Sequence, residues 1–220
     1  MEKPIFPCEY MRITQGYNEG THKDSFAIDN AGKDTNISDV YAPFTGVIKK
    51  IYKNDANEVW LESIDKVEYP DTTIDYMTVM FAHDDNIDDL FVGKRINRGD
   101  VFYHEGTKGN ASGNHCHIEC GKGKFTGTGW HKNSNGYWSI NNSKKPEECL
   151  WITDKIKILN NYGYNFKKIS PVVVEKTENN TNLSMQKEEK IKLEFTAPYK
   201  DLYGVYLNKN EKLVIKEPSQ

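Results

Sequence analysis

Two histidines separated by one residue, His115 and His117, are the part of this sequence best suited to chemistry. The surrounding segment 113–119 has the pattern of a β-strand, in which successive side chains point to opposite faces. His115 and His117 therefore share one face, while Cys116 points toward the interior. Two imidazoles on one rigid face can share a metal ion, or one can bind the metal while the other transfers protons.

Residues upstream of the histidine pair supply further candidate metal ligands. His22 and Asp29 lie between glycine-rich turns, with residues 26–29 forming a short strand that ends at Asp29. One histidine and one aspartate from this region, with one histidine of the pair, give the two imidazoles and one carboxylate of many catalytic zinc sites. Zinc lowers the pKa of a bound water to about 7 and polarises the carbonyl under attack. Asp24 competes with Asp29 as the carboxylate ligand, and the strand pattern favours Asp29.

His83 ends another predicted strand and enters a turn, which is a natural place for a side chain that overhangs a groove. Together with His115, it can orient the water, take its proton and stabilise the developing oxyanion. Glu119 shares the face of the histidine pair. It is either a hydrogen-bond acceptor that orients a ligand histidine or a surface carboxylate.

Four segments follow one another in an order that resembles the lysostaphin/LytM-type zinc endopeptidases. The resemblance extends over roughly residues 12–125. Residues 41–48 resemble an Ala-Pro-x-x-Gly-x-Val strand, and residues 81–83 contain an Ala-His element. Residues 92–101 resemble a Val-Gly-x-x segment with a following glycine, and residues 106–119 a Gly-rich loop that ends in His-x-His-x-Glu. The agreement of four elements in order is more specific than any one of them.

The resemblance implies a zinc endopeptidase that cleaves peptide bonds in the stems or cross-links of bacterial peptidoglycan. It implies zinc ligands at His22, Asp29 and His117, and catalytic, non-ligand histidines at His83 and His115. Tyr17 lies where some members place a tyrosine that stabilises the oxyanion. The six residues between His22 and Asp29 form a longer interval than in most members and resemble a phage lysin or tail-associated branch.

Composition narrows the class of protein. The chain has 220 residues, with 29 basic and 32 acidic side chains and a net charge of -3, and no basic run predicts nucleic-acid binding. No apolar stretch is long enough to span a membrane. Residues 1–7 lack the apolar core of a signal peptide. We therefore expect a protein held in the host cytoplasm before holin-mediated release, or one carried on a virion tail, that acts on peptidoglycan peptides at the cell wall.

The predicted fold is all-β, mostly an antiparallel sheet or sandwich with a groove, a few short helices and a small C-terminal β appendage. Strands are expected at 47–52, 58–62, 76–81, 191–195, 202–206 and 213–215, a Gly/Asn/Ser-rich loop at 126–144, and a helical turn at 146–152. The predicted organisation is a metallopeptidase domain over residues 1–170, a linker over 171–190 and a β appendage over 191–220 that binds the wall or connects to a larger assembly.

Three other hypotheses remain open from the sequence. The first is a degenerate module that binds peptidoglycan without cleaving it. The second is an autoinhibited enzyme, with Asn18, Glu19 or Asp24 filling the fourth zinc position. The third is a thiol hydrolase that uses Cys116, although strand alternation turns this residue away from the histidines. The spacing of the four cysteines matches no zinc or disulfide motif, so we expect reduced, mostly buried thiols.

Overall fold

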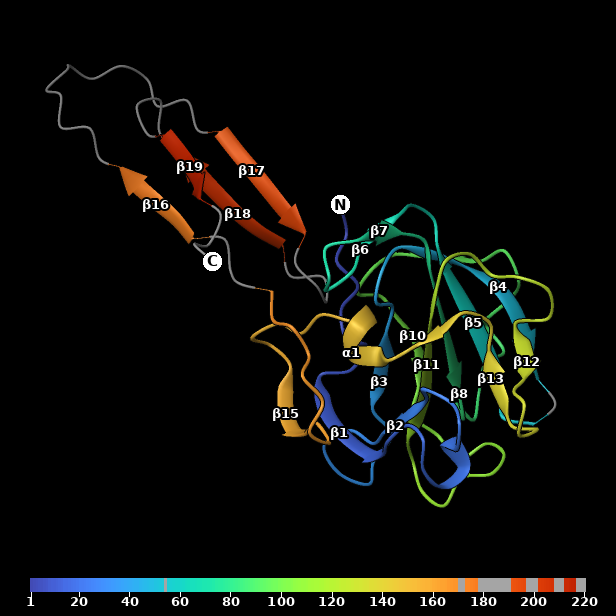
Figure 1. The fold of residues 1–220 in the computed structure, drawn as a ribbon. Helices are drawn as coiled ribbons and strands as arrows, with labels where there is room; N and C mark the ends of the chain where they lie inside the picture. Colours follow the sequence, from blue (N-terminus) through green and yellow to red (C-terminus); the bar gives the residue numbers. More distant parts are fainter. Residues whose placement is uncertain (54, 170–172, 178–190, 197–201, 208–211, 217–220) are drawn as a thin grey trace, which may run out of the picture. The chain divides into compact units, whose positions relative to one another are not determined.

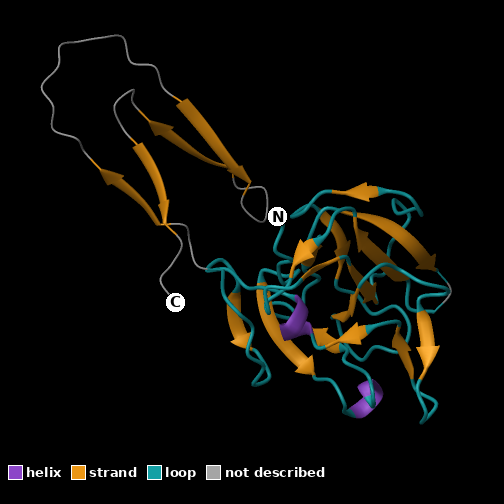
Figure 2. Cartoon of the chain, turned by 45° about the horizontal axis from the view of Figure 1, so that its top comes forward, coloured by secondary structure: helices purple, strands orange, loops and turns teal. Residues whose placement is uncertain are grey.

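The computed structural model describes residues 1–53, 55–169, 173–177, 191–196, 202–207 and 212–216 (Figure 1). The chain divides into two units, Met1–Lys168 and Ile169–Gln220. In the described part, helix is limited to the 3-10 turn η1 (Gly20–His22) and α1 (Pro146–Cys149), and the rest is strand and loop (Figure 2). The predicted all-β class with a few short helices is confirmed.

One large sheet organises the first unit. Every pair of neighbouring strands in it is antiparallel except β1 and β15, which are parallel. β14 (Ser143–Lys144) pairs with β11 beside the main path. The order across the sheet is β15 (Lys157–Asn160), β1 (Tyr10–Gln15), β2 (Ile28–Asn30), β11 (Cys116–Lys122), β8 (Met77–Ala82), β5 (Glu58–Ser63), β4 (Gly46–Tyr52) and β9 (Arg95–Ile96).

Three small antiparallel pairs complete the first unit. They are β3 (Asp39–Tyr41) with β10 (Val101–His104), β6 (Val67–Glu68) with β7 (Ile74–Asp75), and β12 (Trp130–Lys132) with β13 (Trp138–Ile140). The last pair corrects the prediction of a loop over 126–144. The loop between the two strands contains Asn135-Gly136, a dipeptide typical of turns, and Gly136 adopts a positive φ of 84°.

The second unit contains two further antiparallel pairs. β16 (Val173–Thr177) pairs with β19 (Lys212–Lys216), and β17 (Ile191–Thr196) pairs with β18 (Leu202–Leu207). The three strands predicted for the appendage are therefore present. The predicted linker over 171–190 differs, because residues 173–177 form a strand; its remaining residues lie outside the described part of the chain.

The two faces of the central sheet carry different groups of buried side chains. Cys116, Ile118 and Cys120 lie on one face of β11 and are fully buried. All four cysteines are free and buried, as predicted. The other face of the sheet carries a cluster of Trp60, Met80, Ala82 and Ile140, against which Trp130 packs. The β12–β13 hairpin thus covers the same face of the sheet that presents His117.

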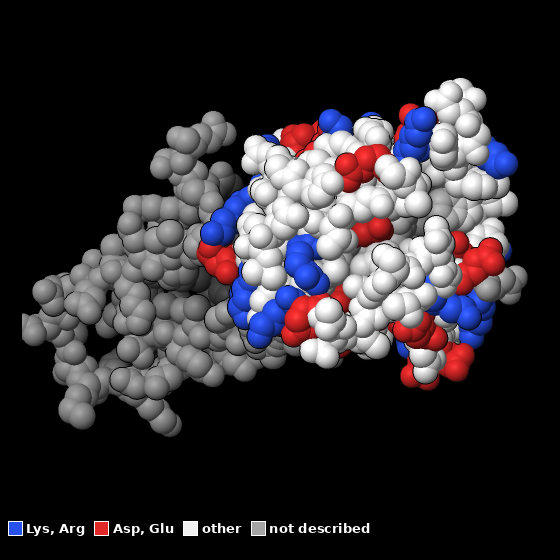
Figure 3. Space-filling model, turned by 90° about the horizontal axis from the view of Figure 1, so that it is seen from below, with Lys and Arg blue, Asp and Glu red and all other residues white. Residues whose placement is uncertain are grey.

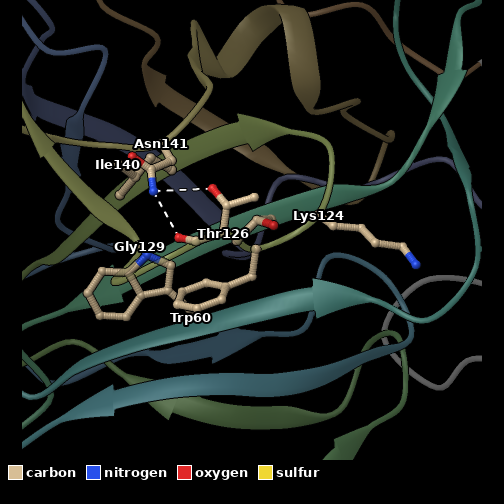
Figure 4. Close-up of a pocket in the computed structure, with 8 residues that line it drawn as sticks. Trp60, Lys124, Thr126, Gly129, Ile140 and Asn141 are labelled. Carbon is tan, nitrogen blue, oxygen red and sulfur yellow. Dashed lines mark hydrogen bonds between the residues drawn. The ribbon is translucent and has the colours of Figure 1, made fainter.

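The loop before this hairpin is fixed over Trp60. Gly129 lies directly over the indole, where an added Cβ would come within 2.8 Å of Trp60 Nε1. The Asn141 amide donates to Thr126 O at 2.9 Å and to Thr126 Oγ1 at 3.3 Å, which closes the loop beside a small hollow (Figure 4). The hairpin is therefore anchored at its base by packing and hydrogen bonds.

Among the described residues, no helix has the length and apolar character needed to cross a membrane.

Candidate metal centre

Strand register brings the first two site residues together. β2, β11 and β8 are neighbours, and His117 lies directly opposite Asp29 on one side and Ala82 on the other. Directly opposed residues on antiparallel strands have Cβ atoms only about 4.5–5.5 Å apart. The pairing therefore aims the Asp29 carboxylate and the His117 imidazole at each other, with His117 Nδ1 3.1 Å from Asp29 Oδ1.

His22 reaches the same carboxylate from a turn. It is the last residue of η1 and is 3% exposed. Its Nε2 lies 3.2 Å from Asp29 Oδ1. The residues Asn18 and Asp24, on either side of η1, adopt positive φ values of 62° and 60°. The chain thus turns sharply twice to direct His22 inward.

The three residues fit the donor set of a zinc ion. One nitrogen of each histidine and a carboxylate oxygen of Asp29 all lie within 4.8 Å of one another. Tetrahedral zinc with ligand bonds of about 2.0–2.2 Å requires donor atoms roughly 3.4 Å apart. The separations of 3.2 and 3.1 Å from Asp29 Oδ1 to the two imidazole nitrogens are close to that spacing.

Hydrogen bonds behind the two imidazoles orient them. His22 Nδ1 lies 3.1 Å from Gly16 O, and a carbonyl only accepts, so Nδ1 carries a proton and Nε2 faces the centre with its lone pair. His117 Nε2 lies 3.4 Å from Glu119 Oε1, so Nδ1 faces the centre. Such partners fix the ring orientation of metal-binding histidines.

Glu119 is itself held in place. It is 2% exposed, and its second carboxylate oxygen accepts from Ser139 Oγ at 3.0 Å and from Ile140 N at 3.2 Å. Of the two interpretations left open by the sequence, the structure favours the orienting acceptor over the surface carboxylate. Ser139 and Ile140 belong to β13, so the hairpin supports the histidine from behind.

His83 and His115 lie side by side next to these three residues. Their ring centroids are 4.5 Å apart, and His115 Nε2 is 3.6 Å from Asp29 Oδ1. His83 follows β8 directly and adopts a φ of 89°, which turns its side chain out of the strand direction. Its Nδ1 lies 2.7 Å from Lys108 O, and His115 Nδ1 lies 2.8 Å from Gly113 O.

Close packing explains a glycine in the loop beside His83. A Cβ at Gly106 would lie 2.2 Å from the carbonyl oxygen of His83, well inside contact distance. Gly106 also exchanges backbone hydrogen bonds with His115, at 3.1 and 3.2 Å. The glycine therefore lets the His83 turn and the His115 segment approach each other.

The pKa values of Asp29, His117 and His83 are shifted by burial and by the contacts that these side chains make. Burial disfavours ionised Asp29, but hydrogen bonds from His117 and His22 outweigh it and hold the Asp29 pKa far below its usual range. Burial also opposes the charge on His117, yet Asp29 and Glu119 raise its pKa to about 10 without a metal. Burial lowers the pKa of His83 to about 4, so this histidine is neutral at physiological pH.

The competing carboxylates have other partners. Asp24 Oδ2 accepts from Asn135 Nδ2 at 2.7 Å, and the Asp24 carbonyl accepts from Asn133 Nδ2 at 3.2 Å. Glu19 accepts from the Gly16 amide and from the Tyr162 hydroxyl. Asp29 is therefore the carboxylate at the centre, and Asp24 instead ties the segment after His22 to the tip of the β12–β13 hairpin.

The Tyr17 side chain has partners outside the group of histidines described above. Its hydroxyl donates to Glu147 Oε1 at 2.8 Å, and its ring stacks on Tyr164 with centroids 4.4 Å apart. Burial, followed by the contact with Glu147, raises the pKa of Tyr17. The oxyanion role that the resemblance implies for Tyr17 stays a prediction.

The two remaining histidines and Cys116 have other surroundings. His104 pairs with Asp84 at 3.1 Å, and His131 lies in β12. Cys116 is fully buried, and burial raises the pKa of its thiol well above the ordinary value. A buried, neutral thiol is a poor nucleophile.

Sequence reasoning missed the groups that hold the histidines. The carbonyls of Gly16, Lys108 and Gly113 belong to the backbone and leave no residue-type signal. Ser139 has no distinctive pattern either. Its position was detectable only through the Asn135-Gly136 turn signal.

Comparisons with known proteins add a phage relative. No family model matches this chain. Morphogenesis protein 1 of Bacillus phage B103 is 30% identical over 166 residues, which are 74% of this chain and 43% of that protein. The chain therefore spans less than half of the length of this curated relative.

Similar solved structures include LytU, with a TM-score of 0.43 and 19% identity over 62% of this chain and 82% of that chain. The catalytic domain of lysostaphin from Staphylococcus simulans has a TM-score of 0.41 and 15% identity, over 62% and 89% of the two chains. A mutant catalytic domain of the prophage-encoded EnpA from Enterococcus faecalis has a TM-score of 0.39 and 18% identity, over 52% and 82%.

Proposed function

We propose that this chain is a zinc-dependent endopeptidase that hydrolyses peptide bonds in the stems or cross-links of bacterial peptidoglycan. The observation that carries the proposal is the convergence of His22 and His117 on Asp29, with both imidazoles oriented from behind. In this proposal the three residues hold zinc, which when bound lowers the pKa of a water to about 7 and polarises the peptide carbonyl.

His83 and His115 supply the proton chemistry. Each has Nδ1 against a backbone carbonyl, so Nδ1 carries a proton and Nε2 is the remaining reactive nitrogen. The lowered pKa of His83 leaves Nε2 unprotonated at neutral pH and able to accept a hydrogen bond or a proton. A histidine that has taken a proton then stabilises negative charge on the substrate oxygen and can return the proton to the leaving amine.

The contacts of the neighbouring side chains favour an active enzyme over an autoinhibited one. Glu19 and Asp24, two of the three candidates for a blocking ligand, are hydrogen-bonded to Tyr162 and Asn135. No ligand of the proposed triad is missing, which argues against a module that only binds the wall.

We further propose that the enzyme is encoded by a phage and works as an endolysin or a tail-associated lysin. The support is the name and source of the 30% identical relative, a phage morphogenesis protein. The second unit, Ile169–Gln220, is proposed to bind the wall or to connect the peptidase to a larger assembly.

The test is the loss of turbidity of purified peptidoglycan, with and without a zinc chelator. We expect chelator-sensitive lysis by the wild type, a fall of at least a hundredfold in His115→Ala, and nearly unchanged lysis in Cys116→Ser. Lysis that resists chelation but is lost in Cys116→Ser would refute the metal mechanism in favour of the thiol. A zinc-loaded chain that cleaves no peptidoglycan would refute the proposed activity.

A further inference from the structure

A hollow of ≈ 410 Å³ adjoins His115 on the side of β1 and the loop after β2. Its walls are the loops around residues 31–35 and 107–115, which are joined where Asn114 Nδ2 donates to Thr35 O at 2.7 Å. His115 lines the hollow and also lies 3.6 Å from Asp29 Oδ1. The hollow therefore adjoins the proposed metal centre through His115.

Charged side chains of both signs are scattered over this side of the first unit. Figure 3 shows the first unit from below the view of Figure 1, with lysines, arginines and acidic residues interspersed over a largely uncharged surface. A substrate is therefore not drawn to this face by a broad patch of one sign. Any charge selection must come from individual side chains within the hollow.

Arg12, on β1, lines the hollow, and its hydrogen bonds are made to backbone carbonyls. Its Nε donates to Ala31 O at 2.7 Å and Gly32 O at 2.9 Å, and its Nη2 donates to Asp34 O at 2.7 Å. All three acceptors are neutral carbonyls. They fix the guanidinium in place, and the buried carboxylate of Glu105, which accepts from the Gly32 amide, also interacts electrostatically with it.

Part of the guanidinium is left for a ligand. Of the five N–H groups of an arginine, these bonds use the Nε–H and one on Nη2, so three remain. Asp34, which also lines the hollow, uses its carboxylate Oδ1 to accept from the Asn36 amide and side chain, both at 2.8 Å. A planar, preorganised guanidinium suits bidentate binding of a carboxylate.

We propose that this hollow is a substrate subsite in which Arg12 binds a free carboxylate of the peptide beside the bond to be cleaved. The inference rests on the proposed peptidase function and deepens it, because it makes Arg12 a determinant of specificity. The enzyme then prefers peptides with an ionised carboxyl group at that position over the same peptides with a carboxamide.

The test compares two stem-type peptides that are identical except for a carboxylate or a carboxamide beside the scissile bond. We expect the wild type to cleave the acid with a kcat/KM at least tenfold higher. Arg12→Gln should lower kcat/KM for the acid by about ten- to a hundredfold, the range of hydrogen bonds to charged groups, and change the amide less than twofold. Asp34→Asn is the matched control from the same hollow and should keep the preference for the acid.

A purely structural Arg12 gives a different pattern. Equal losses on both peptides in Arg12→Gln, or equal cleavage of both by the wild type, would overturn the subsite. Arg12→Lys retains the charge and should keep part of the preference for the acid. This variant keeps the test informative if Arg12→Gln does not fold. The affinities of the two peptides for the zinc-loaded His115→Ala chain measure the preference of the subsite without hydrolysis. Tenfold tighter binding of the acid supports it even if the proposed peptidase activity fails, and equal or absent binding overturns it.

Discussion

Two kinds of support converge at the proposed metal centre. Asp29 and His117 belong to the paired strands β2 and β11, whose register places them opposite each other. His22, His83 and His115 lie at the end of a 3-10 turn or just outside strands, and each has Nδ1 against a backbone carbonyl. The strand residues are positioned by the sheet as a whole, whereas the others depend on a few local hydrogen bonds.

This difference has an energetic consequence. Shifting a strand by one residue would turn its side chains to the other face, so moving Asp29 or His117 means breaking the sheet. A turn residue can move when a single hydrogen bond is lost, at a net cost of about 1 kcal/mol. We expect substitutions in the turns to tune the site and substitutions of the strand residues to remove it.

The largest expected effect separates ligands from catalytic residues. His117→Ala should lose both activity and zinc, because it removes one of three protein ligands. His115→Ala should retain about one zinc per chain while losing activity. Metal analysis of the purified variants measures this. Zinc kept by His117→Ala and lost by His115→Ala would instead place the metal among Asp29, His83 and His115, the second group of donors in the structure.

The next effect concerns the support of the strand-borne ligand. Glu119→Gln should weaken zinc binding by about ten- to a hundredfold, because partners that orient ligand histidines contribute affinity of this size. A competition titration with a chromogenic chelator measures it. Glu62→Gln is the control, since Glu62 is also buried in the sheet but bonds to the Phe125 amide and pairs with Lys49. A similar loss in both variants would contradict a specific role for Glu119.

The pH dependence of stability should change with metal binding. In the metal-free chain, His117 has a pKa of about 10, against about 6.5 when unfolded. Its contribution to stability is therefore complete below about pH 6.5 and is lost as the pH rises through about 10. Zinc requires neutral imidazoles, so zinc-derived stability should instead increase with pH.

Thermal melting from pH 6 to 10, with and without zinc, tests this contrast. The metal-free wild type should lose more stability over this range than metal-free His117→Gln. Equal slopes for the two proteins would show that His117 does not hold the extra proton. The comparison between variants removes the background of lysine and tyrosine titration.

The smallest expected effect lies at the hairpin tip. Asn135→Ala removes the 2.7 Å hydrogen bond to Asp24 Oδ2, which pins the segment after His22. Because the bond is exposed, we expect zinc affinity to fall only about two- to fivefold, equivalent to about 1 kcal/mol or less. Asn97→Ala, which removes a comparable exposed bond to Asp100, should not change it. No difference between the two variants would mean that the hairpin does not position His22.

The sequence allowed the strand-borne half of the centre to be predicted in some detail. The two-residue strand period predicted His115 and His117 on one face, and the short strand before Asp29 favoured it over Asp24. In the structure the strand β11 begins at Cys116, so His117 lies within it opposite Asp29 while His115 lies just before it, and Asp24 is bonded to Asn135. The roles of these residues at a metal stay predictions. The all-β fold followed from short strands separated by turns, and this too is confirmed.

The loop-borne half was less accessible for a physical reason. The orientation of His22 depends on the carbonyl of Gly16, and that of His83 on the carbonyl of Lys108, contacts that no side-chain pattern encodes. Tyr17 bonds to Glu147, 130 residues away, so its environment depends on tertiary packing. The hairpin behind Glu119 was missed because its polar residues were interpreted as a loop.

The carbonyls behind the turn histidines also bear on how such a site can change over evolutionary time. A backbone carbonyl is supplied by any amino acid, so the side chains at 108 and its counterparts are released from selection for that contact. Replacing the side chain at 108 should therefore leave the contact with His83 in place, because the main chain supplies it. The same holds for the main-chain carbonyl of Gly16 behind His22.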